Sequence, residues 1–497
     1  MARIAPTGRQ SGDLKLYPVA PDVYLYRGFF SNSGVLVLPG GVVVVDTQIT
    51  PMAGERLRKA IAAVTDKPII HVINTHYHGD HAGGNLAFPD AEIIATAETE
   101  RYIHERDEER LDYARTFGLQ FQDVPAVAPP TRTFTGKLSL DVGGEVLELF
   151  QAGRVETPDA CVVWWPSRKV LLPGDGVATV SYPYLGVPFL DEGLQDDGQW
   201  IEFLRTMKGL GAEYVLAGHG QGLQGKERIE ARLDLLIALF TDLFAAVKEE
   251  LAKNTPLAEL VLAVDAKLAR YARHKDLEQN TVSQRFAIYR AYNSARPDRR
   301  GKGWWHDFRP SVIKRASAEE AKPILEVVTD QTLSATVRGL AKRHGPLAHT
   351  VLEGWLAAHP DHAAAHALLA DVLFDSAAGI SPVVDATEYI AAAAREAKAA
   401  LALDATCKLA LLNLGCIDIW SAMVLAQSMA PGIARITAAL EAGDLTTKQR
   451  RKAAFFLGKA HQFELRDEEC DRWLRQAMPA WLRFAYPLVR HKLRSIP

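Results

Sequence analysis

The sequence has 497 residues, 48% hydrophobic and 24% charged, which is enough material for roughly two to four domains with real cores. Lys and Arg (57) nearly balance Asp and Glu (60), which disfavours a nucleic-acid partner that needs a strongly basic surface. The four cysteines form no CxxC pair, so we expect neither a disulfide framework nor a thiolate zinc site.

The amino-terminal residues 1–19 lack the apolar core of a secretory signal. No later run is both long and apolar enough to cross a bilayer, so the sequence predicts no membrane partner. We therefore expect a cytoplasmic protein.

Short β-branched and apolar runs, split by turns and helical stretches, fill the first half of the chain. The first two runs flank Pro39-Gly40-Gly41, a hairpin signal. Strands are predicted at 34–38, 42–45, 69–73, 92–95, 146–150, 161–165, 170–172 and 214–217, and helices at 55–63 and 101–113. Strands mixed with helices predict one α/β catalytic domain.

From Glu227 the apolar residues recur every three or four positions, which predicts a long amphipathic helix. Residues 296–310 contain Pro, Gly and charge and are the expected hinge, after which the chain is rich in Ala and Leu. Leu356–Ala370 resembles Leu401–Gly415, and each is typical of the junction between paired helices in a tetratricopeptide-like domain. We expect domains at 1–236 (hydrolase), 237–315 (helical linker) and 316–497 (all-helical).

The segment Thr75–Asn85, THYHGDHAGGN, carries four potential metal ligands directly after a predicted strand. Imidazole and carboxylate groups suit zinc, manganese and iron. Because alternate residues of extended backbone project to the same side, His76 and His78 can serve one ion, while Asp80 and His81 can serve a second. The sequence therefore predicts a metal site at this strand end.

Further candidate ligands come later in the chain, each just past the end of a predicted strand. They are Glu156 in GRVETPDA, Asp175 in LLPGDG and His219 in LAGHG. Singly such residues are more typical of helix caps and solvated turns. Together with the histidine-rich segment they predict a dinuclear site.

This combination resembles the metallo-β-lactamase superfamily over about residues 19–236. The resemblance implies a four-layer αββα sandwich that holds two divalent ions at one edge, most simply Zn2+, with Mn2+ or Fe2+ as alternatives. It implies that one ion is held by His76, His78 and Glu156, and the other by Asp80, His81 and His219, with Asp175 between them.

The acid in VVVVDTQ, Asp46, also matches the superfamily pattern, where it supports the site rather than ligates. Glu156 stands where most of the superfamily has histidine, and in this the chain resembles the alkylsulfatase branch. Residues 288–293 (IYRAYN) and 303–307 (GWWHD) look like that branch's junction to a helical dimerisation domain. The resemblance thus implies a homodimer through the helical domain.

The two ions predict hydrolysis by a hydroxide that bridges them, with Asp80 or Asp175 orienting it or taking its proton. The family resemblance implies a small-molecule alkyl sulfate ester as substrate. However, residues 176–204 contain no Lys, Arg or Asn to receive sulfate, which favours a lactone, carboxylic ester, amide or β-lactam. Tyr182 and Tyr184 in that loop are weak candidates to contact a hydrophobic substrate body. A non-catalytic helical interaction protein is a further alternative.

Overall fold

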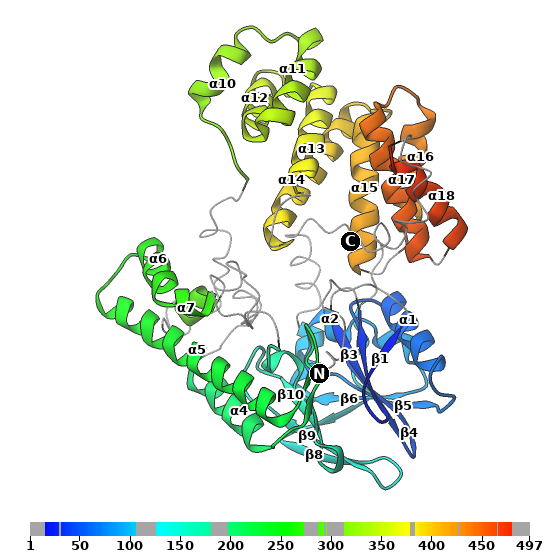
Figure 1. The fold of residues 1–497 in the computed structure, drawn as a ribbon, viewed down its shortest axis with the longest axis vertical. Helices are drawn as coiled ribbons and strands as arrows, with labels where there is room; N and C mark the ends of the chain where they lie inside the picture. The colour runs from blue at the N-terminus through cyan, green and yellow to red at the C-terminus, as the bar shows by residue number, and fades with distance from the viewer. Residues whose placement is uncertain are drawn as a thin grey trace. The chain divides into compact units, whose positions relative to one another are not determined.

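The computed structural model describes residues 15–28, 31–105, 126–179, 197–272, 287–292, 295, 313–377, 383–425, 428–464 and 466–479. These residues divide into two compact units. The described residues up to 295 belong to the first unit, which contains both sheets, and those from 313 belong to the second, which is helical (Figure 1).

A seven-stranded sheet forms the amino-terminal part of the first unit, with its strands in sequence order. The strands are β1 (Leu16–Ala20), β2 (Val23–Arg27), β3 (Asn32–Leu38), β4 (Gly41–Val45), β5 (Ile69–Ile73), β6 (Glu92–Thr96) and β7 (Arg132–Phe134). The strands β1 to β4 pair antiparallel, and β4 to β7 pair parallel. The carboxyl ends of β4 and β5 therefore meet at one edge of the sheet.

A six-stranded sheet follows, in the order β13-β12-β11-β10-β9-β8. Its strands are β8 (Lys137–Asp141), β9 (Val146–Gln151), β10 (Cys161–Trp165), β11 (Val170–Leu172), β12 (Tyr214–Val215) and β13 (Leu223–Gln224). Only β11 and β12 pair parallel, so the connection between them must cross back over the sheet.

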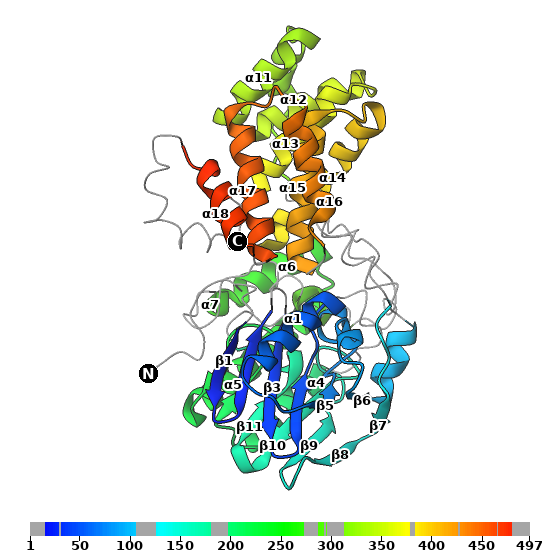
Figure 2. The ribbon, with the colours of Figure 1, turned by 90° about the vertical axis from the view of Figure 1, so that its right-hand side faces the viewer.

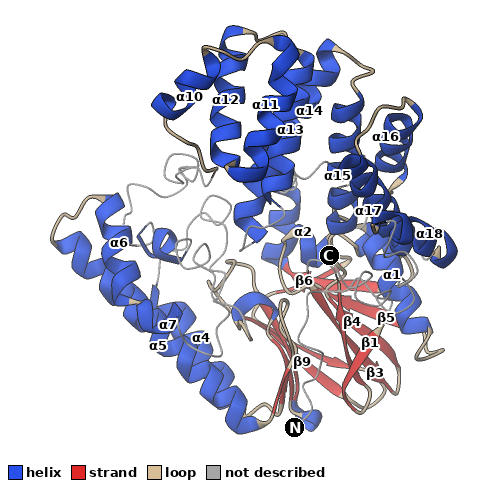
Figure 3. Ribbon diagram, turned by 45° about the horizontal axis from the view of Figure 1, so that its top comes forward, coloured by secondary structure: helices blue, strands red, loops and turns tan. Residues whose placement is uncertain are grey.

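The two sheets pack face to face over a continuous apolar core. Leu36 and Val43 of the first sheet and Val163 and Leu172 of the second belong to this core, and all four are fully or almost fully buried. The opposite face of the first sheet packs against helix α1 (Pro51–Ala62). Figure 2 shows the strands of both sheets, and Figure 3 shows them in red with helices on their outer sides.

The second sheet is covered by α4 (Asp197–Gly209) and α5 (Lys226–Ala252), and α5 contacts β12 and β13. The apolar stripe expected from Glu227 is the buried face of α5. Two shorter helices, α6 (Leu257–Lys267) and α7 (Ala269–Ala272), continue from it. A short helix α2 (Gly79–Ala82) follows β5.

The second unit consists of consecutive helices packed in sequence order. They are α10 (Ala318–Leu325), α11 (Asp330–Arg343), α12 (Gly345–Ala358), α13 (Ala363–Ala377), α14 (Val383–Leu403), α15 (Lys408–Leu425), α16 (Ala430–Glu441), α17 (Thr447–Phe463) and α18 (Asp467–Ala477). The closest pairs are α13 with α14, α15 with α16, and α17 with α18. The two similar segments of the sequence lie at the α12–α13 and α14–α15 junctions.

The expected fold class, an αββα sandwich followed by an all-helical region, is confirmed. The four cysteines are free thiols, as expected. Within the described ranges, every helix is too short or too polar to span a bilayer. The expected hinge at 296–310 lies outside the described residues, as does the expected helix at 101–113 beyond residue 105.

Several predicted bounds differ from the observed ones, and two of these differences have a local reason. Helix α1 begins earlier than the expected residue 55, because the Thr50 hydroxyl accepts a hydrogen bond from the Ala53 amide and Pro51 occupies the first turn. The strand expected at 214–217 ends at Val215. Beyond it the backbone turns to bring residues 217–220 to the start of β3.

Candidate metal centre

The candidate ligands stand on loops at one edge of the two packed sheets. His76 and His78 follow β5, and Asp80 and His81 lie in α2. Three further residues follow or join strands of the second sheet: Glu156 between β9 and β10, Asp175 after β11, and His219 after β12. Strand ends at a common edge thus bring together residues far apart in the sequence.

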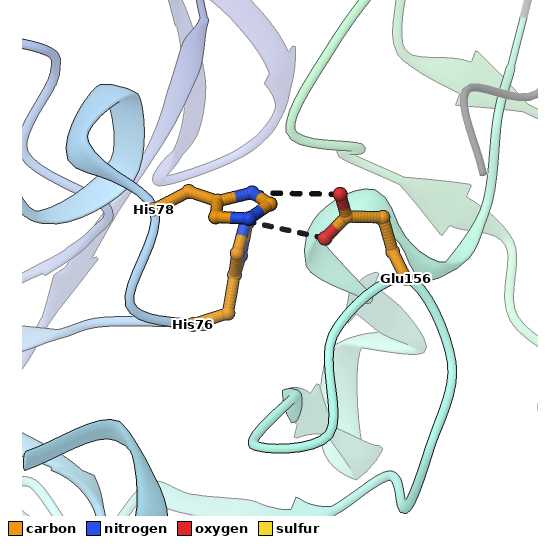
Figure 4. Close-up of side chains that lie close together, drawn as sticks. All are labelled: His76, His78 and Glu156. Carbon is orange, nitrogen blue, oxygen red and sulfur yellow. Dashed lines mark ion pairs between the residues drawn. The ribbon is translucent and has the colours of Figure 1, made fainter. Parts of the chain in front are cut away.

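The structure brings His76, His78 and Glu156 together as one group (Figure 4). His76 Nε2 lies 3.5 Å from Glu156 Oε2, and His78 Nδ1 lies 3.4 Å from Glu156 Oε1. Both imidazoles face the same carboxylate from one side, as expected, but the backbone bends at residues 75–77 instead of continuing extended. This set of two imidazoles and one carboxylate fits a divalent transition-metal ion.

A second group contains Asp80, His81 and His219. Asp80 Oδ2 lies 3.2 Å from Nε2 of both His81 and His219. Asp175 stands between the groups, because its Oδ2 lies 3.4 Å from His81 Nε2 and 3.1 Å from His219 Nε2, and it also joins His76 in a third group. The sequence-predicted ligands are therefore all within reach of two neighbouring positions.

Two buried atoms of the site show that it suits metal ions. His76 Nε2 and Asp175 Oδ1 are buried and have no hydrogen-bond partner. Buried polar atoms are rarely left in this state, because desolvation without a partner costs free energy. Gly218, next to His219, leaves room beside Asp175, since a Cβ there would overlap Asp175 Oδ1 and lie 2.7 Å from His81 Cε1.

Asp46, directly after β4, orients ligands of both groups. Its Oδ2 accepts hydrogen bonds from His81 Nδ1 and from the Thr75 hydroxyl, both at 2.8 Å. Because that hydroxyl donates to Asp46, it accepts from His76 Nδ1, 3.0 Å away. Both imidazoles therefore turn Nε2 toward the site, as expected of a residue that supports the centre without ligating.

In the metal-free protein, the protonation states of the candidate ligands differ between the two groups. Burial and the neighbouring His81 and His78 lower the pKa of His76 well below its usual range, so its Nε2 is a free lone pair. Burial opposes ionisation of Asp80 and Asp175, but His81 and His219 outweigh it and hold the pKa of each carboxyl well below its usual range.

The same carboxylates act on the two histidines that face them. Burial would lower the pKa of His219, but Asp175 and Asp80 outweigh it and raise the pKa to about 10. Burial likewise opposes protonation of His81, yet Asp80, Asp175 and Asp46 raise its pKa well above the usual range. In the metal-free protein, the protons on His81 and His219 thus supply the positive charge beside Asp80 and Asp175.

Three residues that sequence reasoning missed hold the ligand loops. Asn32 at the start of β3 donates its side-chain amide to the carbonyls of Ala217 and Gly220, at 2.9 and 3.0 Å, on both sides of His219. Asp159 accepts from the Tyr77 amide at 2.8 Å, between His76 and His78. Arg290 donates to the Glu156 carbonyl at 3.1 Å. Asp159 lies close to Glu156 in the sequence and Arg290 lies in the quoted segment IYRAYN, but neither pattern indicated a contact with a ligand loop.

The weak substrate-contact candidates Tyr182 and Tyr184 lie outside the described residues. Among the ligands, the His219 side chain is 38% exposed, whereas that of His76 is 2% exposed. Solvent therefore reaches the described part of the site from the side of His219.

Comparison with known families fits this geometry. Residues 26–219 match the model of the metallo-beta-lactamase superfamily. They form a metallo-beta-lactamase domain. The matched range contains Asp46 and every candidate ligand from His76 to His219, and it ends at the last of them.

Curated relatives of the metallo-beta-lactamase domain fall into two kinds. A linear primary-alkylsulfatase from Pseudomonas sp. is 23% identical over 226 residues, which is 39% of this chain and 42% of that enzyme. A metallo-beta-lactamase type 2 from Elizabethkingia meningoseptica is 26% identical over 241 residues, covering 46% of this chain and 87% of that protein. The match thus spans less than half of the alkylsulfatase.

Among solved structures, a double mutant of the sec-alkyl sulfatase PisA1 is similar with a TM-score of 0.53 and 18% identity, covering 77% of this chain and 65% of that one. The stereoselective inverting sec-alkylsulfatase Pisa1 from Pseudomonas sp. gives a TM-score of 0.50 and 17% identity, covering 76% and 64%. At this identity the likeness shows a shared fold, including a helical region behind the metallo-beta-lactamase domain. The family match and the candidate ligands thus fall in the same part of the chain, residues 26–219.

Proposed function

We propose that this chain is a hydrolase that uses two divalent ions, Zn2+ in the first instance, on an ester-type substrate with a hydrophobic body. The observation that carries the proposal is the pair of buried atoms without a hydrogen-bond partner, His76 Nε2 and Asp175 Oδ1, inside a cluster of imidazoles and carboxylates. In the proposed arrangement one ion is held by His76, His78 and Glu156, the other by Asp80, His81 and His219, and Asp175 lies between them.

Two such ions, when bound, lower the pKa of a water molecule and withdraw electron density from the oxygen of the scissile group. The residues of this chain supply the rest of the chemistry. Asp80 and Asp175 remain carboxylates over the ordinary pH range, so either can orient the attacking water and accept its proton. The exposed side of His219 gives the substrate access to this end of the site.

An alkyl sulfate ester is the first substrate class to test. The support is the similarity to the linear primary-alkylsulfatase and a fold shared with Pisa1 over 76% of this chain, helical region included. The alkyl chain would provide the hydrophobic body, and hydrolysis would release sulfate and an alcohol.

A carbonyl substrate is the second class, and a separate observation favours it. Residues 176–204, which follow Asp175 in the sequence, contain acidic residues but no Lys, Arg or Asn to bind an anionic sulfate. The relative from Elizabethkingia meningoseptica, a metallo-beta-lactamase, matches over 87% of its own length. Lactones, carboxylic esters, amides and β-lactams therefore belong in the same assay.

The test is a substrate panel assayed with protein loaded with Zn2+ or Mn2+. It contains primary and secondary alkyl sulfates, lactones, carboxylic esters, amides, β-lactams and a phosphodiester. We expect turnover of one ester-type class, abolished in His76→Ala and Asp175→Asn and retained in Lys208→Ala, an exposed control on α4. Failure to bind any divalent ion, or equal turnover by wild type and both variants, would rule the proposal out.

A further inference from the structure

Arg290, which lies 134 residues after Glu156 in the sequence, contacts the loop that carries Glu156. Its side chain is buried, and it donates from Nη1 to the Glu156 carbonyl at 3.1 Å and from Nη2 to the Val155 carbonyl at 2.6 Å. The planar guanidinium thus binds two successive peptide groups of the ligand loop. A lysine could not reproduce this fork, because an ammonium is a single point of charge.

Trp200 of α4 extends this contact to the loop that carries Asp175. The Arg290 guanidinium lies over the Trp200 ring, 5.2 Å from its centroid. The indole Nε1 in turn donates to the Gly176 carbonyl at 2.9 Å, one residue beyond Asp175. One buried cation therefore contacts the Glu156 loop directly and the Asp175 loop through an aromatic ring.

The position of these two ligands needs such support, because neither stands on a strand: Glu156 lies in a loop, and Asp175 lies in a single 3-10 turn, Gly174–Gly176. Two other residues of α4 contact the same loops. Gln199 Oε1 accepts a hydrogen bond from the Arg154 main-chain amide at 3.2 Å. Phe203 packs closely on Gly176, since a Cβ added to this glycine would lie 2.7 Å from the Phe203 ring. The first turns of α4 and the side chain of Arg290 thus contact both loops. We call the pair of side chains Arg290 and Trp200 the Arg–Trp bracket.

We propose that Arg290 is a positioning residue, which acts through the Arg–Trp bracket to hold Glu156 and Asp175 at the separation that binds metal. The inference rests on the proposed function, since it assumes that these carboxylates are ligands. When a residue that orients metal ligands is removed, metal affinity or activity commonly falls by roughly tenfold to a hundredfold. A residue with a purely structural role would lower thermal stability and leave metal affinity unchanged.

The experiment measures metal affinity in the full chain, by competition between the protein and a chromophoric chelator for Zn2+ and Co2+. Arg290→Met removes the fork, and Arg290→Lys keeps the charge. Trp200→Phe keeps an aromatic face but loses the hydrogen bond to Gly176. Phe240→Leu is the control, because Phe240 packs against Trp200 with 5.0 Å between ring centroids but lies on α5. Circular dichroism and Tm check folding.

In Arg290→Met we expect affinity for one of the two ions to fall roughly tenfold to a hundredfold, with a shifted visible spectrum of bound Co2+. Arg290→Lys and Trp200→Phe should lose less, and Phe240→Leu should lower only the Tm. Unchanged affinity for both ions in Arg290→Met, beside a wild type that binds two, would overturn this inference alone. So would an equal loss in Phe240→Leu. A wild type that binds no ion would overturn the proposed function and this inference together.

Discussion

At the scale of single residues, Asp46 and Thr75 link the two halves of the metal centre. Asp46 acts on His81 directly and on His76 through the Thr75 hydroxyl. The Thr75 amide also donates to Asp46 Oδ1 at 2.8 Å, so the carboxylate is held from the backbone as well. One carboxylate therefore sets the ring orientation of a histidine in each group.

We predict that Asp46→Asn lowers the affinity for both ions, whereas Thr75→Val lowers mainly the affinity for the ion bound by His76. The amide in Asp46→Asn cannot accept all the hydrogen bonds of the carboxylate, and we expect metal affinity to fall roughly tenfold to a hundredfold. Thr75→Val removes only the hydroxyl and keeps its backbone bond to Asp46. Stepwise Zn2+ titration checks this, and equal weakening of both ions by Thr75→Val would contradict it.

The raised pKa values of His81 and His219 predict that metal uptake releases protons. Both histidines are protonated at pH 7.5 in the metal-free protein and must lose a proton to ligate. Calorimetric titration with Zn2+ in buffers of different ionisation enthalpy measures the number released. We expect fewer protons from His219→Gln than from wild type, and the same number from both would refute the assignment.

The same shift fixes how the stability of the metal-free protein depends on pH. The pKa of His219 is about 10 in the folded chain against an ordinary 6.5, so its contribution is complete below pH 6.5. It is lost as the pH rises through about 10. Chelator-treated wild type should therefore lose more Tm between pH 7 and 10 than chelator-treated His219→Gln, and parallel curves would contradict this.

At the scale of elements, the turn after β12 is packed too closely for any side chain at Gly218. The Gly218 main-chain amide donates to the Gly174 carbonyl at 3.0 Å, and the Gly218 carbonyl accepts from the main-chain amide of Asn32 at 2.7 Å. Three ligand-bearing or ligand-supporting segments thus meet at one glycine. The requirement is for space, because a Cβ would enter the position of Asp175.

We predict that Gly218→Ala displaces Asp175 and strongly reduces metal content while the sheets still form. The matched control is Gly209→Ala at the end of α4, where a Cβ would meet no atom within 4 Å. Metal analysis of both variants, with circular dichroism to check folding, tests the prediction. A Gly218→Ala protein with wild-type metal content would show that the turn can adjust.

Most central strands could be predicted from the sequence, and none of the four edge strands could. Ile69–Ile73, Cys161–Trp165 and Val170–Leu172 match the predicted bounds, because strands with neighbours on both sides are continuous apolar runs. The missed strands are β1, β7, β8 and β13, which are the four sheet edges, and β2, a central strand whose sequence VYLYR ends in Arg. In β8, for example, KLSLD contains one buried residue, so it has no apolar run to recognise.

The candidate site divides in the same way. The candidate ligands could be found because each stands beside a strand end in a recognisable cluster or motif. The roles of Asn32 and Arg290 could not, even though Arg290 lies in the quoted segment IYRAYN, since their hydrogen bonds reach 185 and 134 residues along the chain and depend on the packed fold. Long-range polar contacts of this kind leave no local pattern in a single sequence.

At the scale of the whole molecule, we propose that the helical region makes a homodimer, as its resemblance to the alkylsulfatase branch implies. Light scattering should then give a mass roughly twice that of the 54.6 kDa chain. The mass should not change when the metal is removed by a chelator, because the proposed ligands all lie in the first unit. A monomer at micromolar concentration would refute the prediction.

The distance between Arg290 and Glu156 along the chain also affects the order of events during synthesis. Translation proceeds from the amino terminus, so the candidate ligands leave the ribosome before the residue proposed to hold two of them. At roughly 5–20 residues per second, the 134 residues between Glu156 and Arg290 take about 7 to 27 seconds to make. On the proposed role of Arg290, a nascent chain would hold its metal weakly during this interval, and tight loading would follow translation.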